Sequence, residues 1–269
     1  MKHKWNDIVV ITDVKWRKSL SAIRAIGKNN YFVIAIGNSV FDMGLWSSYV
    51  DKRVIIPNLM KNQEKYKSKL ITILEQCYKK WGKKPILFTM EDITLKFLIE
   101  NRSVINKCKC LIPDLESYNI ANNKFWALQT AKELGIEIPY TKQFENLSDL
   151  LLFIQSNPKR NWVVKPEVGK GSFGVTYVTS KQDLDIIKKH WKQYGKLIVQ
   201  DRIPLKGESI CVAMIFSNNN KLSNYFVYKR LHTYPIRGGA STSRIGVSNN
   251  SLVKQSYRIM KALKWTGVV

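Results

Sequence analysis

Apolar runs and helical spacings alternate along the first part of the chain. The runs have the apolar character of strands that are buried on both faces of a parallel sheet. Between them, apolar residues recur every three to four positions, which is typical of amphipathic helices. The expected strands are 8–11, 31–36, 49–57 and 85–88, and the expected helices lie around 20–27, 62–81 and 93–99. This alternation predicts a small, doubly wound parallel sheet over residues 1–115.

The pattern becomes mixed after residue 115. The expected elements are helices at 119–134, from 147 onward, at 181–191 and at 251–263, a hairpin with strands at 162–164 and 175–178, and further strands at 196–200, 209–216, 222–229 and from 264. Gly135 is suited to end the first of these helices, and Ser148 is a candidate cap for the second. Helices and antiparallel strands in this order predict an α+β region.

A glycine-rich loop joins the two strands of the predicted hairpin. Lys165 stands at the end of the first strand, where its ammonium group can point at a ligand. Pro166 ends that strand because it has no N–H to donate. The residues that follow include Gly169, Gly171, Ser172 and Gly174. Glycines allow the backbone to approach closely, so this loop is suited to place N–H groups over a polyphosphate.

The spacing Gly169-x-Gly171-x-x-Gly174 also matches the dinucleotide-binding fingerprint. That fingerprint needs a helix at its third glycine, whereas β-branched and aromatic residues follow Gly174 here. The segment does not match the Walker A motif, because Gly171 follows Lys170 where that motif requires Ser or Thr. A protein kinase would place its lysine after the loop and carry H-R-D and D-F-G, which the chain lacks. A plain hairpin with a glycine turn stays as an alternative.

A second polar loop is predicted at 229–242. Arg237 and Ser241 flank a Gly-Gly pair, so backbone N–H groups and a guanidinium group could surround an anion there. The alternative is an ordinary loop with turn glycines. His232 is expected to be structural rather than catalytic.

The formal net charge of +24 permits two interpretations. A basic face could bind nucleic acid. The lysines are dispersed, however, with no block of five or more like charges, which favours solvated helix faces and makes nucleic acid an unlikely partner. An acidic ligand could account for part of the charge.

Composition also bears on location. An apolar content of 45% over 269 residues is enough for a globular core, and two or three domains are expected. Neither a long apolar run nor a signal peptide is present, so no membrane association is predicted. Four cysteines form no disulfide framework in a chain of this size, which favours the cytoplasm. Cys108 and Cys110 have no second pair or nearby histidines, so no metal ligands are assigned.

Several of these segments, in this order, resemble the ATP-grasp superfamily over nearly the whole chain. Asn123-Lys124, followed by a helix and 135–139, is similar to the segment with the family's first ATP lysine. Lys165 and the glycine loop are similar to its second lysine and mobile phosphate loop. The stretch 199–203, with Glu208, resembles the hinge that holds adenine and ribose. Carbamoyl-phosphate-synthase-like carboxylate–amine ligases are the most similar branch.

The resemblance implies a Rossmann-like pre-ATP-grasp domain at 1–115 and an incomplete two-subdomain ATP-grasp fold, with subdomains at 116–195 and 196–269. It also implies a role for each matched position. Lys124 and Lys165 would contact the α- and β-phosphates, and Gly169, Gly171, Ser172 and Gly174 would cover the triphosphate. Gln200 would offer its amide to adenine, the backbone of Asp201 and Ile203 would read the adenine edge, and Glu208 would accept from ribose. The segment 229–242, with Lys229 and Arg237 as catalytic candidates, would hold the carboxylate or acylphosphate.

The implied activity is ATP-dependent joining of a carboxylate to an amine through an acylphosphate, with ATP and Mg²⁺ as cofactors. In the family, the acidic Mg²⁺ ligands follow the strand that begins here at 264, so they are expected beyond Val269. We therefore expect a truncated chain that binds ATP and turns over little substrate. A homodimer is compatible with this interpretation. The alternatives are a non-catalytic ATP-binding protein, a dinucleotide-dependent oxidoreductase and a basic nucleic-acid-binding protein.

Overall fold

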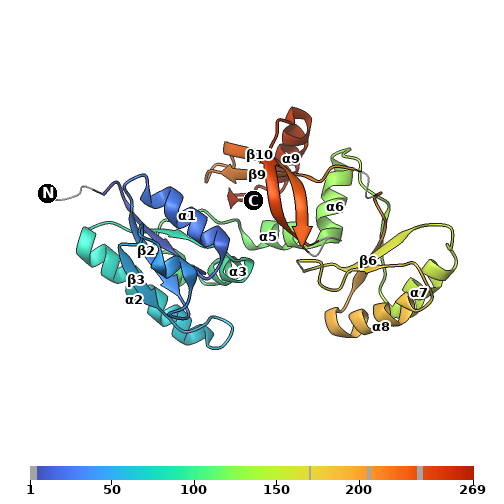
Figure 1. Cartoon of the computed structure of the whole chain (residues 1–269), viewed down its shortest axis with the longest axis horizontal. Helices are drawn as coiled ribbons and strands as arrows, with labels where there is room; N and C mark the ends of the chain where they lie inside the picture. Colours follow the sequence, from blue (N-terminus) through green and yellow to red (C-terminus); the bar gives the residue numbers. More distant parts are fainter. Residues whose placement is uncertain (1–4, 170, 205–206, 235–238) are drawn as a thin grey trace. The chain divides into compact units, whose positions relative to one another are not determined.

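The computed structural model describes residues 5–169, 171–204, 207–234 and 239–269. The chain forms two compact units, which meet in the sequence between Leu115 and Glu116. They are coloured blue to green and green to red in Figure 1. None of the helices in the described ranges is both long enough and apolar enough to cross a bilayer.

The first unit contains the predicted parallel sheet, in the strand order β3-β2-β1-β4. Its strands are β1 (Ile8–Ile11), β2 (Phe32–Gly37), β3 (Lys52–Ile55) and β4 (Ile86–Phe88). Its helices are α1 (Arg17–Gly27), η1 (Met43–Trp46), α2 (Gln63–Trp81), α3 (Asp92–Glu100) and α4 (Arg102–Ile105). Successive residues of a strand point to opposite faces, so Val10 packs with α2 while Ile11 packs with α1. The prediction of a doubly wound sheet is confirmed.

The second unit begins with two helices, α5 (Leu115–Asn122) and α6 (Lys124–Glu133), where the sequence predicts one. Asn123 separates them because its backbone is extended, with φ −91° and ψ 116°. Its side-chain Oδ1 accepts from the backbone N–H groups of Phe125 and Trp126. This is the N-cap geometry, which Asn favours over a position inside a helix. The break places Lys124 at the first position of α6.

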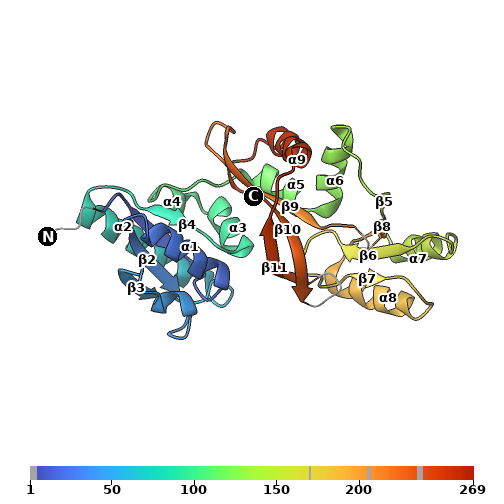
Figure 2. The ribbon, with the colours of Figure 1, turned by 45° about the horizontal axis from the view of Figure 1, so that its top comes forward.

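The glycine-rich loop belongs to a four-stranded sheet of order β5-β8-β6-β7. Its strands are β5 (Thr141–Gln143), β6 (Trp162–Pro166), β7 (Thr176–Tyr177) and β8 (Leu197–Asp201). One face packs against α7 (Leu147–Gln155) and α8 (Asp183–Tyr194), which lie together beside the sheet in Figure 2. Asn146, rather than the predicted Ser148, caps α7 by accepting from the Asp149 N–H. The predicted boundary at 195 would separate β8 from this sheet, so we propose that the subdomain extends through Asp201.

The last sheet is antiparallel, with the order β11-β10-β9-β12. Its strands are β9 (Ile210–Phe216), β10 (Leu222–Tyr234), β11 (Ala240–Gly246) and β12 (Gly267–Val268), and α9 (Asn250–Ala262) precedes the last of them. The loop predicted at 229–242 is therefore wrong for 229–234 and 240–242, which belong to β10 and β11, whereas 235–238 lie outside the described residues. Aromatic and β-branched residues continue the strand pattern past Lys229, and β10 pairs with β11 from Tyr228 to Tyr234.

Candidate functional site

One face of the β5-β8-β6-β7 sheet carries a group of polar side chains, although its opposite face is part of a hydrophobic core. Lys165 lies opposite Ile198 in β8, and Val163 lies opposite Gln200. Directly opposed residues share a face, so Lys165 and Gln200 project from the same side of the sheet. Thr141 of β5 lies opposite Gln200 and joins them there. The sheet register therefore collects polar side chains from three strands that are distant in the sequence.

Lys165 is held in place by a short chain of hydrogen bonds on this face. Its Nζ donates to Gln200 Oε1 at 2.7 Å, and Gln200 Nε2 donates to Thr141 Oγ1 at 2.7 Å. Gln200 is only 5% exposed, and both ends of its amide are engaged. Each end still has one further donor or acceptor site, so the contact between this amide and adenine stays a prediction. In this structure the Gln200 amide oxygen contacts Lys165 and limits where its ammonium group lies.

Lys124 reaches the same region from the start of α6. Its backbone N–H donates to the carbonyl oxygen of Glu167 at 2.8 Å, and its Nζ donates to the carbonyl oxygen of Gly169 at 2.8 Å. These bonds connect the first turn of α6 to the beginning of the glycine-rich loop. The structure thus brings together the two lysines that sequence analysis singled out.

The electrostatics of the two lysines are unfavourable without a ligand. Burial lowers the pKa of Lys124. Burial also lowers the pKa of Lys165, and the nearby charge of Lys124 lowers it further. Neither ammonium group forms an ion pair with a carboxylate among the described residues. A polyanion placed between them would remove the repulsion and favour both charged forms.

Glu167 links three parts of this site. Its carboxylate accepts from Asn123 Nδ2 at 2.9 Å and from the side-chain amide of Gln143 in β5. Sequence analysis missed Glu167, Gln143 and Thr141. The strand β5 is short and polar, so it lacks the apolar alternation that reveals strands. Only the position of Glu167, two residues after Lys165, could have drawn attention to it.

The glycine-rich loop turns through a series of positive φ angles. They are +146° at Gly169, +68° at Gly171, +65° at Ser172 and +73° at Gly174. A Cβ at Gly174 would lie 2.6 Å from Pro166 Cγ and 2.8 Å from Tyr194 Cε2, so both the backbone angle and the space require glycine there. Strand β7 follows, and no helix begins at Gly174. This confirms that the loop is not a dinucleotide fingerprint. Lys170 lies outside the described residues.

The remaining predicted residues form separate contacts. Asp201, at the end of β8, pairs with Arg160, whose guanidinium group lies over the rings of Tyr140 and Trp162. Ile203 is 66% exposed. Glu208 and Lys229, which were expected to serve ribose and the carboxylate respectively, form an ion pair with each other. Arg237 lies outside the described residues.

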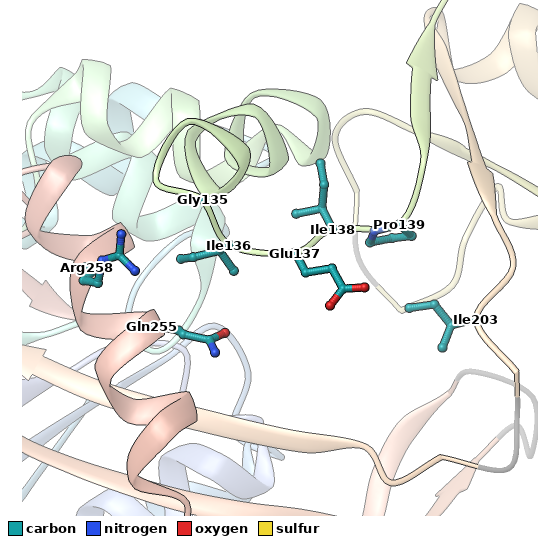
Figure 3. Close-up of a pocket in the computed structure, with 8 residues that line it drawn as sticks. All are labelled: Gly135, Ile136, Glu137, Ile138, Pro139, Ile203, Gln255 and Arg258. Carbon is teal, nitrogen blue, oxygen red and sulfur yellow. The ribbon is translucent and has the colours of Figure 1, made fainter.

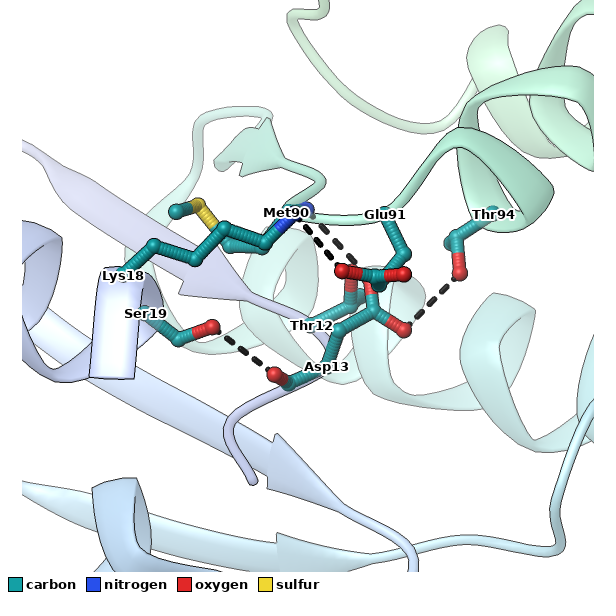
Figure 4. Close-up of polar contacts among 7 residues, drawn as sticks. All are labelled: Thr12, Asp13, Lys18, Ser19, Met90, Glu91 and Thr94. Atoms are coloured by element: carbon teal, nitrogen blue, oxygen red, sulfur yellow. Dashed lines mark hydrogen bonds and ion pairs between the residues drawn. The ribbon is translucent and has the colours of Figure 1, made fainter. Parts of the chain in front are cut away.

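The first unit holds a second polar cluster, which sequence analysis missed. Asp13 follows β1 with φ +58°, and its carboxylate accepts from Thr12 Oγ1, Thr94 Oγ1 and the Met90 N–H (Figure 4). Burial raises the pKa of this carboxyl group. Lys18 and Glu91 form an ion pair of 2.6 Å beside it. The cluster lies at the carboxyl ends of β1 and β4, where the chain connections of the sheet diverge in opposite directions.

The domain model of the ATP-grasp family matches residues 121–268, more than half of the chain. No curated protein sequence matches. Among solved structures, N5-carboxyaminoimidazole synthetase from Staphylococcus aureus complexed with ADP is similar, with a TM-score of 0.68, 14% identity, and coverage of 98% of this chain and 65% of that chain. The biotin carboxylase–β-γ-ATP complex from Campylobacter jejuni has a TM-score of 0.70, 15% identity, and coverage of 97% and 60%.

D-alanine–D-alanine ligase from Bacillus anthracis has a TM-score of 0.58, 18% identity, and coverage of 97% of this chain and 80% of that chain. At these identities, the likeness concerns the fold. This chain spans about two thirds or less of the length of the first two relatives.

Proposed function

Because the chain belongs to the ATP-grasp family, we propose that the polar face around Lys124 and Lys165 binds ATP and serves a ligase. The ligase would join a carboxylate to an amine through an acylphosphate. A non-catalytic ATP-binding protein is the alternative. The proposed partners are ATP and small-molecule carboxylate and amine substrates, and both a cytoplasmic location and a homodimer stay predictions.

The convergence of two uncompensated lysines beside a glycine-rich loop is the observation that carries the proposal. Lys124 already donates to the first glycine of the loop, so the ammonium group and the loop backbone face a shared space. A triphosphate there would accept from both lysines and from loop N–H groups, as phosphates do in backbone concavities. The two ammonium groups are destabilised by burial and by mutual repulsion in the free protein, and they would then form charge-assisted hydrogen bonds with the phosphates.

The adenine and ribose contacts are proposed with one change from the sequence-based assignment. The backbone of 201–203 stays the candidate for reading the adenine edge. Gln200 is assigned to orienting Lys165. Glu208 is proposed to accept from ribose hydroxyls, and Lys229 is its partner when no nucleotide is bound.

The proposed reaction has two displacements. A carboxylate oxygen of the substrate attacks the γ-phosphorus of ATP, the bond to the bridging oxygen breaks, and ADP leaves. The amine nitrogen then attacks the acyl carbon, inorganic phosphate leaves, and the nitrogen loses a proton to solvent. Lys165 and Lys124 would offset negative charge on the phosphates, and Lys229 and Arg237 are proposed near the carboxylate.

Phosphoryl transfer from ATP normally uses Mg²⁺ to neutralise developing charge. Among the described residues, no group of three or more His, Cys, Asp or Glu side chains gathers in a way that could hold a metal ion. Magnesium that accompanies ATP is commonly bound by one or two carboxylates together with the phosphates, so the Mg²⁺ ligands stay a prediction and no step above is assigned to the metal.

Calorimetric titration with ATP tests the binding proposal. Replacing Lys165 with Met removes a charge-assisted contact worth about 1.5–3 kcal/mol, so ATP affinity should fall roughly ten- to hundredfold. Lys159→Met is a matched control, because Lys159 is exposed and outside the site. Equal ATP affinity for wild type and Lys165→Met would remove the central observation from the proposal.

The ligase chemistry needs a separate test. Because little turnover is expected of this chain, the readout is a low rate of ADP formation that rises above background only when a carboxylic acid and an amine are both supplied from a panel of substrates. ATP binding with no such rise under any combination would favour the non-catalytic alternative. A melting temperature raised by NADH and unaffected by ATP would contradict both.

A further inference from the structure

A cleft of about 590 Å³ lies in the second unit, and the residues that line it include neither of the two lysines and no residue of the glycine-rich loop. It is formed by the segment after α6, by Ile203 after β8, and by one side of α9 (Figure 3). Small-molecule pockets in proteins commonly have volumes of about 300–1,000 Å³. The cleft is therefore large enough for a ligand of its own.

The lining of the cleft contains both apolar and polar side chains. Ile136, Ile138 and Ile203 provide apolar surface. Glu137 and Gln255 point into the same space in Figure 3, and Arg258 lies at the α9 side. These side chains contribute one carboxylate, one amide and one guanidinium group.

Two of the three polar side chains have no partner in the protein. Glu137 is exposed and Gln255 is half-buried, and neither the Glu137 carboxylate nor the Gln255 amide makes a hydrogen bond or ion pair with another described residue. Arg258 donates from Nη2 to the carbonyl oxygen of Leu134, which leaves its other N–H groups available. Glu137 and Arg258 are not paired with each other within 4.0 Å. A ligand with both an ammonium and a carboxylate group would complement the two separately.

The position of the cleft connects it to the candidate ATP site. The β5-β8-β6-β7 sheet and its helices come from one continuous stretch of chain, 141–201. Two covalent connections therefore join it to the rest of the unit, one before β5 and one after β8. Both connections line the cleft, the first through Glu137 and the second through Ile203.

Each connection also leads directly to a lysine of the ATP site. Helix α6 has ten residues and begins with Lys124, so its far end is about 15 Å from that lysine. Gln200, which orients Lys165, lies three residues before Ile203 in the sequence. A ligand that contacts both connections would therefore favour one arrangement of the β5-β8-β6-β7 sheet relative to the rest of the second unit, and would so change ATP affinity.

We propose that this cleft binds an apolar, zwitterionic amino acid as an effector of ATP binding. The ammonium group is placed at Glu137, the carboxylate at Arg258, and the side chain against the isoleucines. The effector role rests on the proposed ATP site, whereas the binding of the amino acid does not.

The probes are L-leucine, L-valine and L-methionine at millimolar concentration, without nucleotide. At least one of them should raise the melting temperature of the wild-type chain. Glu137→Gln, which keeps the shape of the side chain, should remove the shift, and so should Arg258→Met. Lys254→Met is the matched control on an exposed position of the same helix and should keep the shift. Leucine analogues that lack either the ammonium or the carboxylate group should be inactive.

The coupling is measured by calorimetric titration with ATP at saturating amino acid. We expect the dissociation constant for ATP to change several-fold. The dissociation constant for the amino acid should change by the same factor when ATP is saturating. No shift with any probe, or an equal shift in wild type and Glu137→Gln, would overturn the proposal. An amino-acid shift that depends on Glu137 in a chain without ATP affinity would leave the cleft site intact and contradict the proposed function instead.

Discussion

If ATP binds as proposed, Lys124 and Lys165 are the residues whose charge state should respond most directly to it. Burial holds the pKa of each below the ordinary lysine value of 10.5 in the free protein. Phosphate contacts favour the ammonium form, so ATP should raise both pKa values again. At pH values below the lowered pKa, both lysines are charged with or without ATP, so their titration should not make ATP affinity depend on pH in that range.

ATP affinity should therefore fall as the pH rises through these lowered pKa values, and binding in that range should take up protons. Calorimetry in two alkaline buffers with different ionisation enthalpies measures the uptake. Lys165→Met should take up fewer protons than wild type. Proton release on binding in this range would contradict the assigned role of both lysines.

Gly174 offers a second test at the level of one residue. Its φ of +73° is close to the +68° of Gly135, but a Cβ at Gly135 would meet no atom within 4 Å. Gly135→Ala should therefore cost only about 1 kcal/mol of stability for the backbone angle. Gly174→Ala should cost about 1–3 kcal/mol more, because the added carbon overlaps Pro166 and Tyr194. Denaturant unfolding of the two variants gives this difference, and equal losses would show that the loop moves freely away from Tyr194.

At the scale of elements, α8 supports the polar face from the other side of the sheet. Ile187 is fully buried in the core that includes Trp162 and Val164, whereas its neighbour Ile186 is 42% exposed. Ile187→Ala should lower the free energy of unfolding by about 2–5 kcal/mol. Ile186→Ala should lower it much less, because it leaves no cavity. Denaturant midpoints of the two variants test this assignment, and a larger loss for Ile186→Ala would mean that the helix presents a different face.

At the scale of the whole molecule, the two units should respond differently to ATP. The lysines, the glycine-rich loop and the hinge segment all belong to the second unit. At 100 times its dissociation constant, ATP should stabilise that unit by about 2.7 kcal/mol. Amide hydrogen exchange should slow in β6 and β8 on ATP addition. Slowing confined to β1 and β4 would instead place the nucleotide near Asp13.

The sequence by itself determined the elements that depend on near neighbours in the chain. Apolar runs and helical spacing predicted the parallel sheet of the first unit. Lys165, Pro166 and the glycines predicted a strand that enters a tight loop, and the structure contains both. Such features are encoded over a few residues, because strand alternation, helical periodicity and glycine φ angles are local properties.

Only the tertiary structure decided which polar groups meet. Gln200 contacts Lys165 because the register of β6 against β8 places them on one face, and a shift of one residue would separate them. Glu167 joins α6 to β5, and Asp13 meets Thr94 across 81 residues of sequence. Strand register and helix packing are set by the burial of apolar surface over the whole unit, so these contacts leave no pattern in any short stretch of the chain.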